Sequence, residues 1–521
     1  MSSKTNLSLN NILSAAGWFI FVFFFFFIVH TTINGFFGSD PYYHAAHSSY
    51  YFDRWYYVEN WIELHFFSSR PVDPYFLFHK FGGEFIELFG KDLGFKIYGS
   101  ILAGIAVSVF FIILKLLQVK KANLWTIFFL FSSPFFFSRL FLIRSFLLAI
   151  PLILICYYFI KKEKWLYLFI TSFFYSLYYT LGVFVLIIET LFTAVMMYQK
   201  GKIYWRPLFY SFLGISFGIA LHPQSLNYLY QIYIHTVDIF YLKAIGVKLP
   251  TGTEINLSSF SDLLFNNYLT VLLYLPAIAV FLGGYKTQKL KQYSPLFVIS
   301  LFWFLLMTFI PRAVEYWHPF AILFSAVIFS NVKIPQAAWD RIKNKLYWDK
   351  SYITKAFLVF VISILLVINA TATTAKRIER HRSGAQPEHY REVAENISKV
   401  SKNKELIFFT NWSLFPKFFY YNQKNRYITG FDPVFAYRHN PKKYWLWLNL
   451  STHAQACKSP DLCPTESVNN HHTQIKQGLN QLKVDYIILQ KEDKLLKKTL
   501  EQIKSIEFLL QNKYFTVFRV K

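Results

Sequence analysis

Long apolar runs recur along most of this 521-residue chain and constrain its fold more than any other feature. A helix that crosses a bilayer needs roughly 20 apolar residues, and shorter runs suffice where helices pack together or re-enter the membrane. Hydrophobic residues make up 54% of the chain and charged residues 16%, which excludes an ordinary soluble protein of this length. The pattern predicts an α-helical polytopic membrane protein with about eleven transmembrane helices. The predicted spans are residues 12–33, 97–118, 122–138, 145–160, 165–180, 182–198, 207–221, 267–284, 294–310, 319–332 and 354–371.

Basic residues predict the orientation of these spans. The net charge of +25 is carried by lysines in short clusters between apolar runs, so we interpret it as a topology signal and expect no nucleic-acid partner. With a cytoplasmic N-terminus, every loop on the cytoplasmic side is basic: the loops near Lys120, Lys161, Lys200 and Lys286, and residues 341–350. The extracytoplasmic side then receives residues 34–96, 139–144, 222–266 and 311–318, and everything after residue 371.

Two extracytoplasmic parts are long enough to fold. The first loop, residues 34–96, mixes aromatic side chains with His, Asp and Arg, which favours short amphipathic helices on the bilayer. The tail is predicted to form a small α/β domain at residues 385–521, separate from a transmembrane domain at residues 1–384. Within the tail we expect strands at 405–409 and 484–489, a helix at 494–506 and a hairpin at 506–520.

Asp40 lies at the mouth of a membrane span, within the sequence Gly-Ser-Asp-Pro-Tyr-Tyr-His at residues 38–44. Asp-Pro is a common helix start, so a structural cap is one interpretation of this carboxylate. The functional interpretation depends on arginines and acids predicted on the same face. Arginine matches phosphate oxygens and a carboxylate can take a proton from a hydroxyl, which suits transfer from a phosphate-bearing lipid to an acceptor. The face receives Asp40, Asp73, Arg139, Arg144, His222, Glu254, Arg312 and Glu315.

Several of these residues also have a structural interpretation. Arg139 and Arg144 lie at span ends, where arginines commonly extend towards water. Arg312 and Glu315 share a tight turn and can simply pair with one another. Glu254 is most simply a solvated loop residue. Sequence alone leaves both interpretations open for each residue.

The first loop also contains a weak metal-ligand pattern. His44 and His47 follow Asp40 by four and seven residues, so the three side chains would share a helix face. A divalent cation, Mg²⁺ or Mn²⁺, is therefore possible, but we assign no residue as a metal ligand.

The three cysteines do not form a disulfide framework. Cys156 lies in an apolar run, whereas Cys457 and Cys463 lie close together in the polar tail. The latter two can pair if the tail faces an oxidising compartment.

The motif at residues 38–44 resembles the first-loop motif of the oligosaccharyltransferase branch of the GT-C superfamily of membrane glycosyltransferases. That superfamily uses polyprenyl-phosphate-linked sugars and is similar in having many spans and often a soluble C-terminal domain. Residues 411–416 and 426–433 also look like the tail of uncharacterised bacterial members. The chain departs from the oligosaccharyltransferases in having no Trp-Trp-Asp motif and no second acidic motif near Arg139, while residues 251–254 are similar to their Thr-x-x-Glu motif.

The resemblance implies a multi-pass protein of the bacterial inner membrane with a periplasmic tail. It implies that Asp40 is the catalytic carboxylate, deprotonating an acceptor hydroxyl in an inverting transfer from a polyprenyl-phosphate sugar. We expect Asp73 and His79 to position the acceptor or Asp40, and Arg312 with Arg144 to stabilise the leaving phosphate. The full expected set is Asp40 and Asp73 as catalytic, and His44, His79, Arg144, Glu254, Arg312 and Glu315 as substrate-binding. The acceptor would be an extracytoplasmic glycan, lipid or protein.

Two alternatives from other classes remain at this point. One is a flippase or transporter of a lipid-linked sugar, which would need a polar path through the spans. The other is a non-catalytic membrane scaffold whose periplasmic tail binds a partner.

Overall fold

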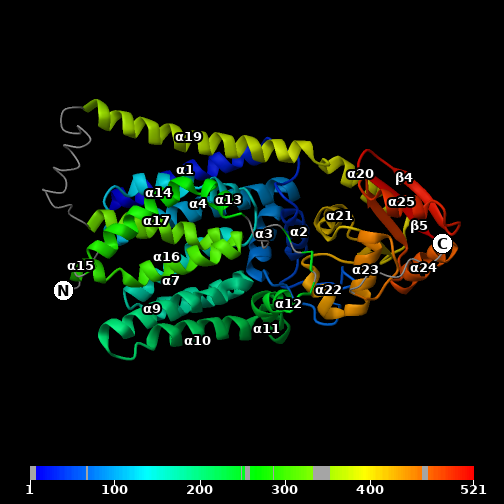
Figure 1. Ribbon diagram of the computed structural model, residues 1–521, viewed down its shortest axis with the longest axis horizontal. Helices are drawn as coiled ribbons and strands as arrows, with labels where there is room; N and C mark the ends of the chain where they lie inside the picture. The colour runs from blue at the N-terminus through cyan, green and yellow to red at the C-terminus, as the bar shows by residue number, and fades with distance from the viewer. Residues whose placement is uncertain are drawn as a thin grey trace.

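The computed structural model describes residues 8–65, 68–247, 249–250, 252, 259–285, 287–331, 352–459 and 468–521. It forms an elongated bundle of apolar helices with a small mixed domain at one end (Figure 1). Among the described residues, five helices are long and apolar enough to cross a membrane: Leu9–Thr31, Lys91–Leu116, Thr180–Lys200, Pro311–Asn331 and Val359–Val400. Six shorter apolar helices are Ala122–Phe131, Phe146–Lys161, Trp165–Tyr178, Arg206–Leu221, Tyr268–Gly283 and Ser294–Phe309. Each helix overlaps one predicted run, so the chain is a multi-pass membrane protein.

The bundle consists of helices that follow one another along the chain. Its helices are α1 (Leu9–Thr31), α4 (Lys91–Leu116), α5 (Ala122–Phe131), α6 (Pro134–Leu140), α7 (Phe146–Lys161), α8 (Trp165–Tyr178), η3 (Thr180–Phe184), α9 (Val185–Lys200), α10 (Arg206–Leu221), α14 (Tyr268–Gly283), α15 (Gln288–Lys291), α16 (Ser294–Phe309), η5 (Pro311–Ala313), α17 (Val314–Asn331) and α19 (Tyr352–Ser383). Between α10 and α14 lie α11 (Ser225–Tyr233), η4 (Ile234–Asp238), α12 (Ile239–Ala244) and α13 (Phe260–Phe265).

The third predicted span, residues 122–138, is two helices rather than one. Helix α5 ends at Phe131, and Pro134 begins α6 because proline has no N–H for a helix interior but suits a first turn. The Ser133 hydroxyl oxygen accepts a hydrogen bond from the N–H of Phe136 at 2.9 Å and so caps α6. This break turns the chain at the end of the bundle and places Arg139 there.

The first loop forms α2 (Asp40–Ser48), η1 (Ser49–Tyr51) and α3 (Phe76–Phe89). These helices lie between the bundle and the C-terminal domain (Figure 1). All residues of α2 from Pro41 to Ser48 are buried, whereas an amphipathic helix on the bilayer would leave one face open. The reason is that the C-terminal domain covers α2: the rings of Tyr42 and Tyr420 pack edge to face, with centroids 5.4 Å apart.

The C-terminal domain contains a five-stranded sheet in the order β2-β1-β3-β5-β4. Strand β1 pairs in parallel with β2 and β3, while β5 pairs antiparallel with β3 and β4. The strands are β1 (Leu406–Phe409), β2 (Arg426–Tyr427), β3 (Tyr486–Gln490), β4 (Ile506–Gln511) and β5 (Phe515–Val520). The helices are α20 (Pro387–Val400), η6 (Trp412–Leu414), α21 (Phe415–Tyr421), α22 (Pro433–His439), α23 (Pro441–His453), α24 (Val468–Gln481) and α25 (Lys494–Leu500). The predicted strands and hairpin are confirmed, but the predicted helix at 494–506 ends at Leu500.

The first loop and the tail are joined through the sheet edge. Ile62 forms a parallel bridge with Tyr427 of β2, and the N–H of Tyr427 donates to the carbonyl of Trp61 at 2.8 Å. Leu64 continues the ladder by donating to the carbonyl of Ile428 at 2.8 Å. The two parts that the sequence assigns to one side of the membrane are therefore in direct contact.

Candidate active site

Asp40 begins helix α2, as the Asp-Pro sequence predicts, but its carboxylate does not cap the helix. The Asp40 side chain forms an ion pair with Arg144, which lies in the turn between α6 and α7. Both groups are partly open, with 36% of the Asp40 side chain and 14% of the Arg144 side chain exposed. Arg144 is therefore directed at a specific carboxylate rather than simply towards water.

Glu315 joins two further arginines at the same end of the bundle. Its Oε1 accepts hydrogen bonds from Nε (2.8 Å) and Nη2 (2.5 Å) of Arg139, and its Oε2 lies 3.6 Å from Nε of Arg312. Glu315 and Arg139 are almost fully buried, whereas 24% of the Arg312 side chain is exposed. Glu315 therefore interacts with both arginines, and Arg312 is the more exposed of the two.

Two tyrosines connect these ion pairs. Arg312 Nη2 donates to the Tyr179 hydroxyl at 3.3 Å, and Arg144 also acts on that hydroxyl electrostatically. Tyr75 interacts electrostatically with Arg312, Arg144 and Asp40, and its ring lies 6.3 Å from that of Tyr179. We call the group of Asp40, Arg144, Arg312, Tyr75 and Tyr179 the mouth. The ion pairs in and next to the mouth contain three arginines and two carboxylates: Arg139, Arg144, Arg312, Asp40 and Glu315. Their net charge of +1 suits an anionic ligand.

Asp73 lies behind the mouth and is fully buried. Its carboxylate accepts from the Tyr51 hydroxyl at 2.6 Å and from the N–H of Tyr75 at 3.0 Å, and Nδ1 of His79 lies 2.8 Å from both of its oxygens. Burial alone would raise the pKa of Asp73, but His79 and His47 outweigh it and hold this pKa below its ordinary value. Asp73 is therefore ionised and does not reach the surface.

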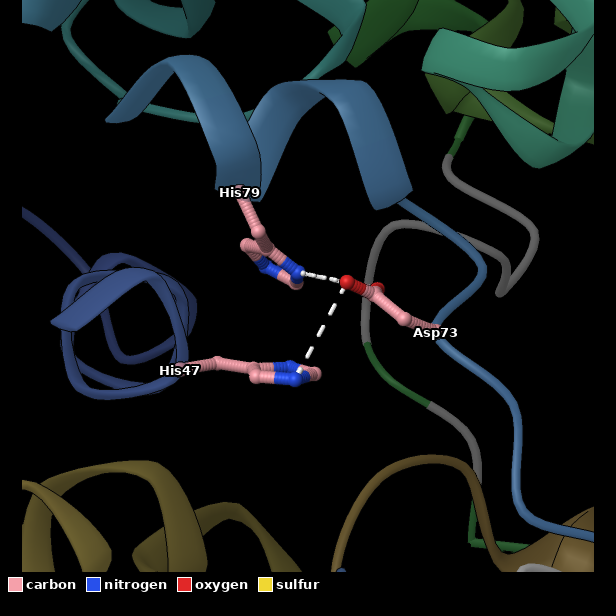
Figure 2. Close-up of side chains that lie close together, drawn as sticks. All are labelled: His47, Asp73 and His79. Atoms are coloured by element: carbon pink, nitrogen blue, oxygen red, sulfur yellow. Dashed lines mark hydrogen bonds and ion pairs between the residues drawn. The ribbon is translucent and has the colours of Figure 1, made fainter. Parts of the chain in front are cut away.

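His47 and His79 both point towards Asp73, the first from α2 and the second from α3 (Figure 2). Nε2 of His47 is 3.9 Å from Oδ2 of Asp73 but closer, at 2.9 Å, to the carbonyl oxygen of Tyr57. On its other side, Nδ1 of His47 lies 2.8 Å from the Tyr43 hydroxyl. His44, which the sequence places on the same helix face as His47, instead contacts His79, with 2.8 Å between Nδ1 and Nε2.

The remaining predicted residues fall in different places. His222 is buried, and its Nε2 donates to the backbone carbonyl of Asp73 at 3.0 Å, so it supports the chain around Asp73. Glu254 lies outside the described residues. Sequence reasoning missed Tyr75 and Tyr179, because aromatic residues at span ends are too common to single out.

Neither carboxylate environment fits a divalent cation. Asp40 is paired with Arg144, a cation, and the donor atoms of His47, Asp73 and His79 lie within 4.8 Å of one another as a buried group. In that group Nε2 of His47 faces a carbonyl and Nδ1 of His79 faces an ionised carboxylate. Both nitrogens donate in this arrangement, so a metal bound at these two atoms would have to displace both hydrogens.

Cys457 is disulfide-bonded, as predicted for an oxidising environment, while Cys156 is free and buried. Cys463 lies outside the described residues.

No protein-family model matches this sequence, and no curated protein matches it. Solved structures do resemble the fold. The oligosaccharyltransferase AglB from Archaeoglobus fulgidus, in complex with an inhibitory peptide and a dolichol-phosphate, is 12% identical with a TM-score of 0.54, covering 92% of this chain and 70% of that chain. ArnT from Cupriavidus metallidurans, bound to undecaprenyl phosphate, is 10% identical with a TM-score of 0.56, covering 96% of this chain and 97% of that chain. The chain therefore shares its fold with these two proteins over most of its length.

Proposed function

We propose that this protein is a membrane glycosyltransferase that moves a sugar from a polyprenyl-phosphate donor to an acceptor at the extracytoplasmic face. The observation that carries the proposal is the mouth, where Asp40 pairs with Arg144 and Tyr75 interacts with Asp40, Arg144 and Arg312. These three side chains come from distant parts of the sequence, yet all are partly exposed at one end of the bundle. The prenyl phosphates bound by the similar structures of ArnT and AglB support a ligand of this class.

The reaction that suits this site is attack of an acceptor hydroxyl on the anomeric carbon of the sugar. The new carbon–oxygen bond forms as the bond from the anomeric carbon to the phosphate oxygen breaks, which inverts the configuration. Asp40 takes the hydroxyl proton, and Arg312 and Arg144 stabilise the negative charge on the leaving polyprenyl phosphate. Because donor phosphate and Asp40 compete for Arg144, donor binding also frees the Asp40 carboxylate for the acceptor.

The other residues support the mouth from behind. Glu315 positions Arg312. Asp73 and His79 are buried behind the mouth and contact one another, and His44 of α2 contacts His79. The disulfide at Cys457 fits a tail in an oxidising compartment, such as the periplasm of a bacterial cell whose inner membrane holds the bundle. No step requires a metal ion.

The test is transfer of label from radiolabelled undecaprenyl-phosphate hexoses and pentoses to crude envelope acceptors. Membranes with the wild type should incorporate label, and Asp40→Asn should reduce incorporation by roughly a hundredfold or more, since a positioned base contributes about 10²–10⁴-fold. Asp53→Asn is the matched control, because Asp53 belongs to the same loop but its side chain is 68% exposed and pairs with exposed Arg54.

Wild-type activity should survive in Asp53→Asn. Equal incorporation by the wild type and Asp40→Asn, with both proteins present at equal levels, would contradict the role of Asp40. No incorporation by the wild type with any donor would refute the transferase and favour a scaffold or a transporter.

A further inference from the structure

A continuous line of hydrogen bonds leads from the buried Asp73 back towards the mouth. Nδ1 of His79 lies 2.8 Å from the Asp73 carboxylate, and Nε2 of the same ring lies 2.8 Å from Nδ1 of His44. The three side chains come from the loop before α3, from α3 and from α2, so the fold assembles the line. Proton removal by Asp40 does not by itself require this line of hydrogen bonds.

The chemistry of the partners sets the direction of each hydrogen bond. Ionised Asp73 can only accept, so Nδ1 of His79 carries a hydrogen. In the His79 tautomer with hydrogen on Nδ1, the lone pair is on Nε2, which accepts from Nδ1–H of His44. Burial, together with His79 and Arg144, holds the pKa of His44 well below its ordinary value, so this ring is neutral too. The lone pair at the end of the line is therefore on Nε2 of His44.

This nitrogen is at the side of the mouth. His44 lies one helical turn after Asp40 on α2, which places the two side chains next to each other on the helix surface. The His44 ring packs edge to face on Tyr75, at 5.1 Å between centroids, and 4% of His44 remains exposed. Among the described residues, Nε2 of His44 makes no hydrogen bond, and this atom is not fully enclosed.

We propose that His44, His79 and Asp73 form a proton relay that receives the acceptor proton from Asp40. The proposal rests on the proposed transferase function. As the acceptor oxygen bonds to the anomeric carbon and the phosphate leaves, the hydroxyl proton passes through Asp40 to Nε2 of His44. The hydrogen on Nδ1 of His44 moves to Nε2 of His79, and the positive charge rests on His79 beside the Asp73 carboxylate. Asp40 is restored as a carboxylate, and the relay returns its proton to water when product leaves.

The arrangement gives a reason for each member. His44 lies one helical turn from Asp40 on α2, so it is placed to take the proton that Asp40 receives. Donor and acceptor cover the mouth during transfer, and the relay supplies a route that stays open beneath them. The buried carboxylate of Asp73 compensates the charge that arrives on His79, which would otherwise be costly away from water.

The test compares kcat and KM for label transfer in His44→Gln, Asp73→Asn and the double variant. His44→Gln should lower kcat by roughly a hundredfold with KM changed by less than about threefold, as for a lost proton acceptor. Asp73→Asn should lower kcat by about 10–100-fold, typical of a group that acts through another. Since Asp73 acts only through His44, the double variant should be no slower than His44→Gln alone.

His47→Gln is the matched control, because His47 is equally buried and near Asp73 but lies outside the line. It should keep kcat within about threefold of the wild type, a change too small for loss of a proton acceptor. Imidazole added to His44→Ala should restore part of the lost rate, which a purely structural role would not allow. If Asp73→Asn does not fold, His79→Gln takes its place in the double-variant comparison.

Normal turnover in His44→Gln, or effects of His44→Gln and Asp73→Asn that multiply in the double variant, would overturn the relay. A stoichiometric transition metal in the purified wild type, lost in His47→Gln, would also overturn it, because a metal needs the lone pairs that the relay assigns to hydrogen. These results differ from failure of the proposed function, in which Asp40→Asn is as active as the wild type or the wild type transfers nothing.

Discussion

Replacing Glu315 by Gln should destabilise the protein strongly, because it removes the charge that compensates a buried arginine. Arg139 and Glu315 have side chains that are 3% and 1% exposed, and Arg139 makes two hydrogen bonds to one Glu315 oxygen. The amide oxygen of Gln can still accept both of these bonds but carries no charge. Arg139 would then remain as a buried cation without its carboxylate.

Breaking one partner of a buried ion pair costs about 3–5 kcal/mol of unfolding free energy. The exposed pair between Lys80 and Glu84 is a matched control, with 52% of the Glu84 side chain exposed and the residues four apart on α3. Glu84→Gln should cost only about 0.3–0.5 kcal/mol. The free energies would be measured by equilibrium unfolding of purified protein in mixed detergent and SDS micelles, followed by circular dichroism.

A double variant separates the lost charge from lost packing. Arg139→Met with Glu315→Met removes both charges, so it should be more stable than Glu315→Gln even though it changes two residues. If Glu315→Gln proves no more destabilising than Glu84→Gln, or if the double variant is less stable than the single one, the ion pair does not carry this stability.

Three further outcomes follow from the structure. Burial and neighbouring His79 lower the pKa of His47 from 6.5 to about 4. As the pH falls from 6.5 towards 4, this histidine becomes protonated in the unfolded chain but stays neutral in the native protein. Unfolding free energy should therefore drop by about 3 kcal/mol by pH 4 on account of His47, and His47→Gln should lack this share of the drop in acid titrations. Arg312→Lys, which keeps charge but loses the forked donor geometry, should raise the KM for lipid donor about tenfold in initial-rate assays, and an unchanged KM would remove Arg312 from the donor site. In spheroplasts, a membrane-impermeant maleimide should label Cys457 only after reduction; labelling without reductant, or none after reduction, would contradict the disulfide or the exposed tail.

Some of the site is visible in the sequence because local chemistry reports it. Asp-Pro predicts a helix start at Asp40. Pro134 carries a similar local signal, because proline ends helical patterns, but residues 122–138 were predicted as one span. The ionisable groups near span ends identify Arg144 and Arg312 as candidates, because charged residues avoid the membrane interior. These signals do not indicate which residue each charged side chain contacts.

For the buried residues Asp73, His79 and His44, too, the sequence predicts only part of the contacts. Asp73 and His79 are only six residues apart, and their contact is compatible with the start of α3, but the sequence gives no sign that His44 joins them or that Asp73 is wholly enclosed. The spacing of His44 and His47 is a weak metal-ligand pattern, and the structure gives the two rings different hydrogen-bond partners. A helix face is wide enough for neighbouring side chains to meet different elements.

Apolar run length and the period of strands and helices are local properties, so a multi-pass helical membrane protein with an α/β tail can be predicted from the sequence. The pairing of Glu315 with Arg139, 176 residues away, and the covering of α2 by the tail become visible only in the folded chain. Such contacts depend on how helices pack against one another and on the depth at which each side chain is sealed from water. That information is spread over the whole set of packed surfaces, so no single stretch of sequence contains it.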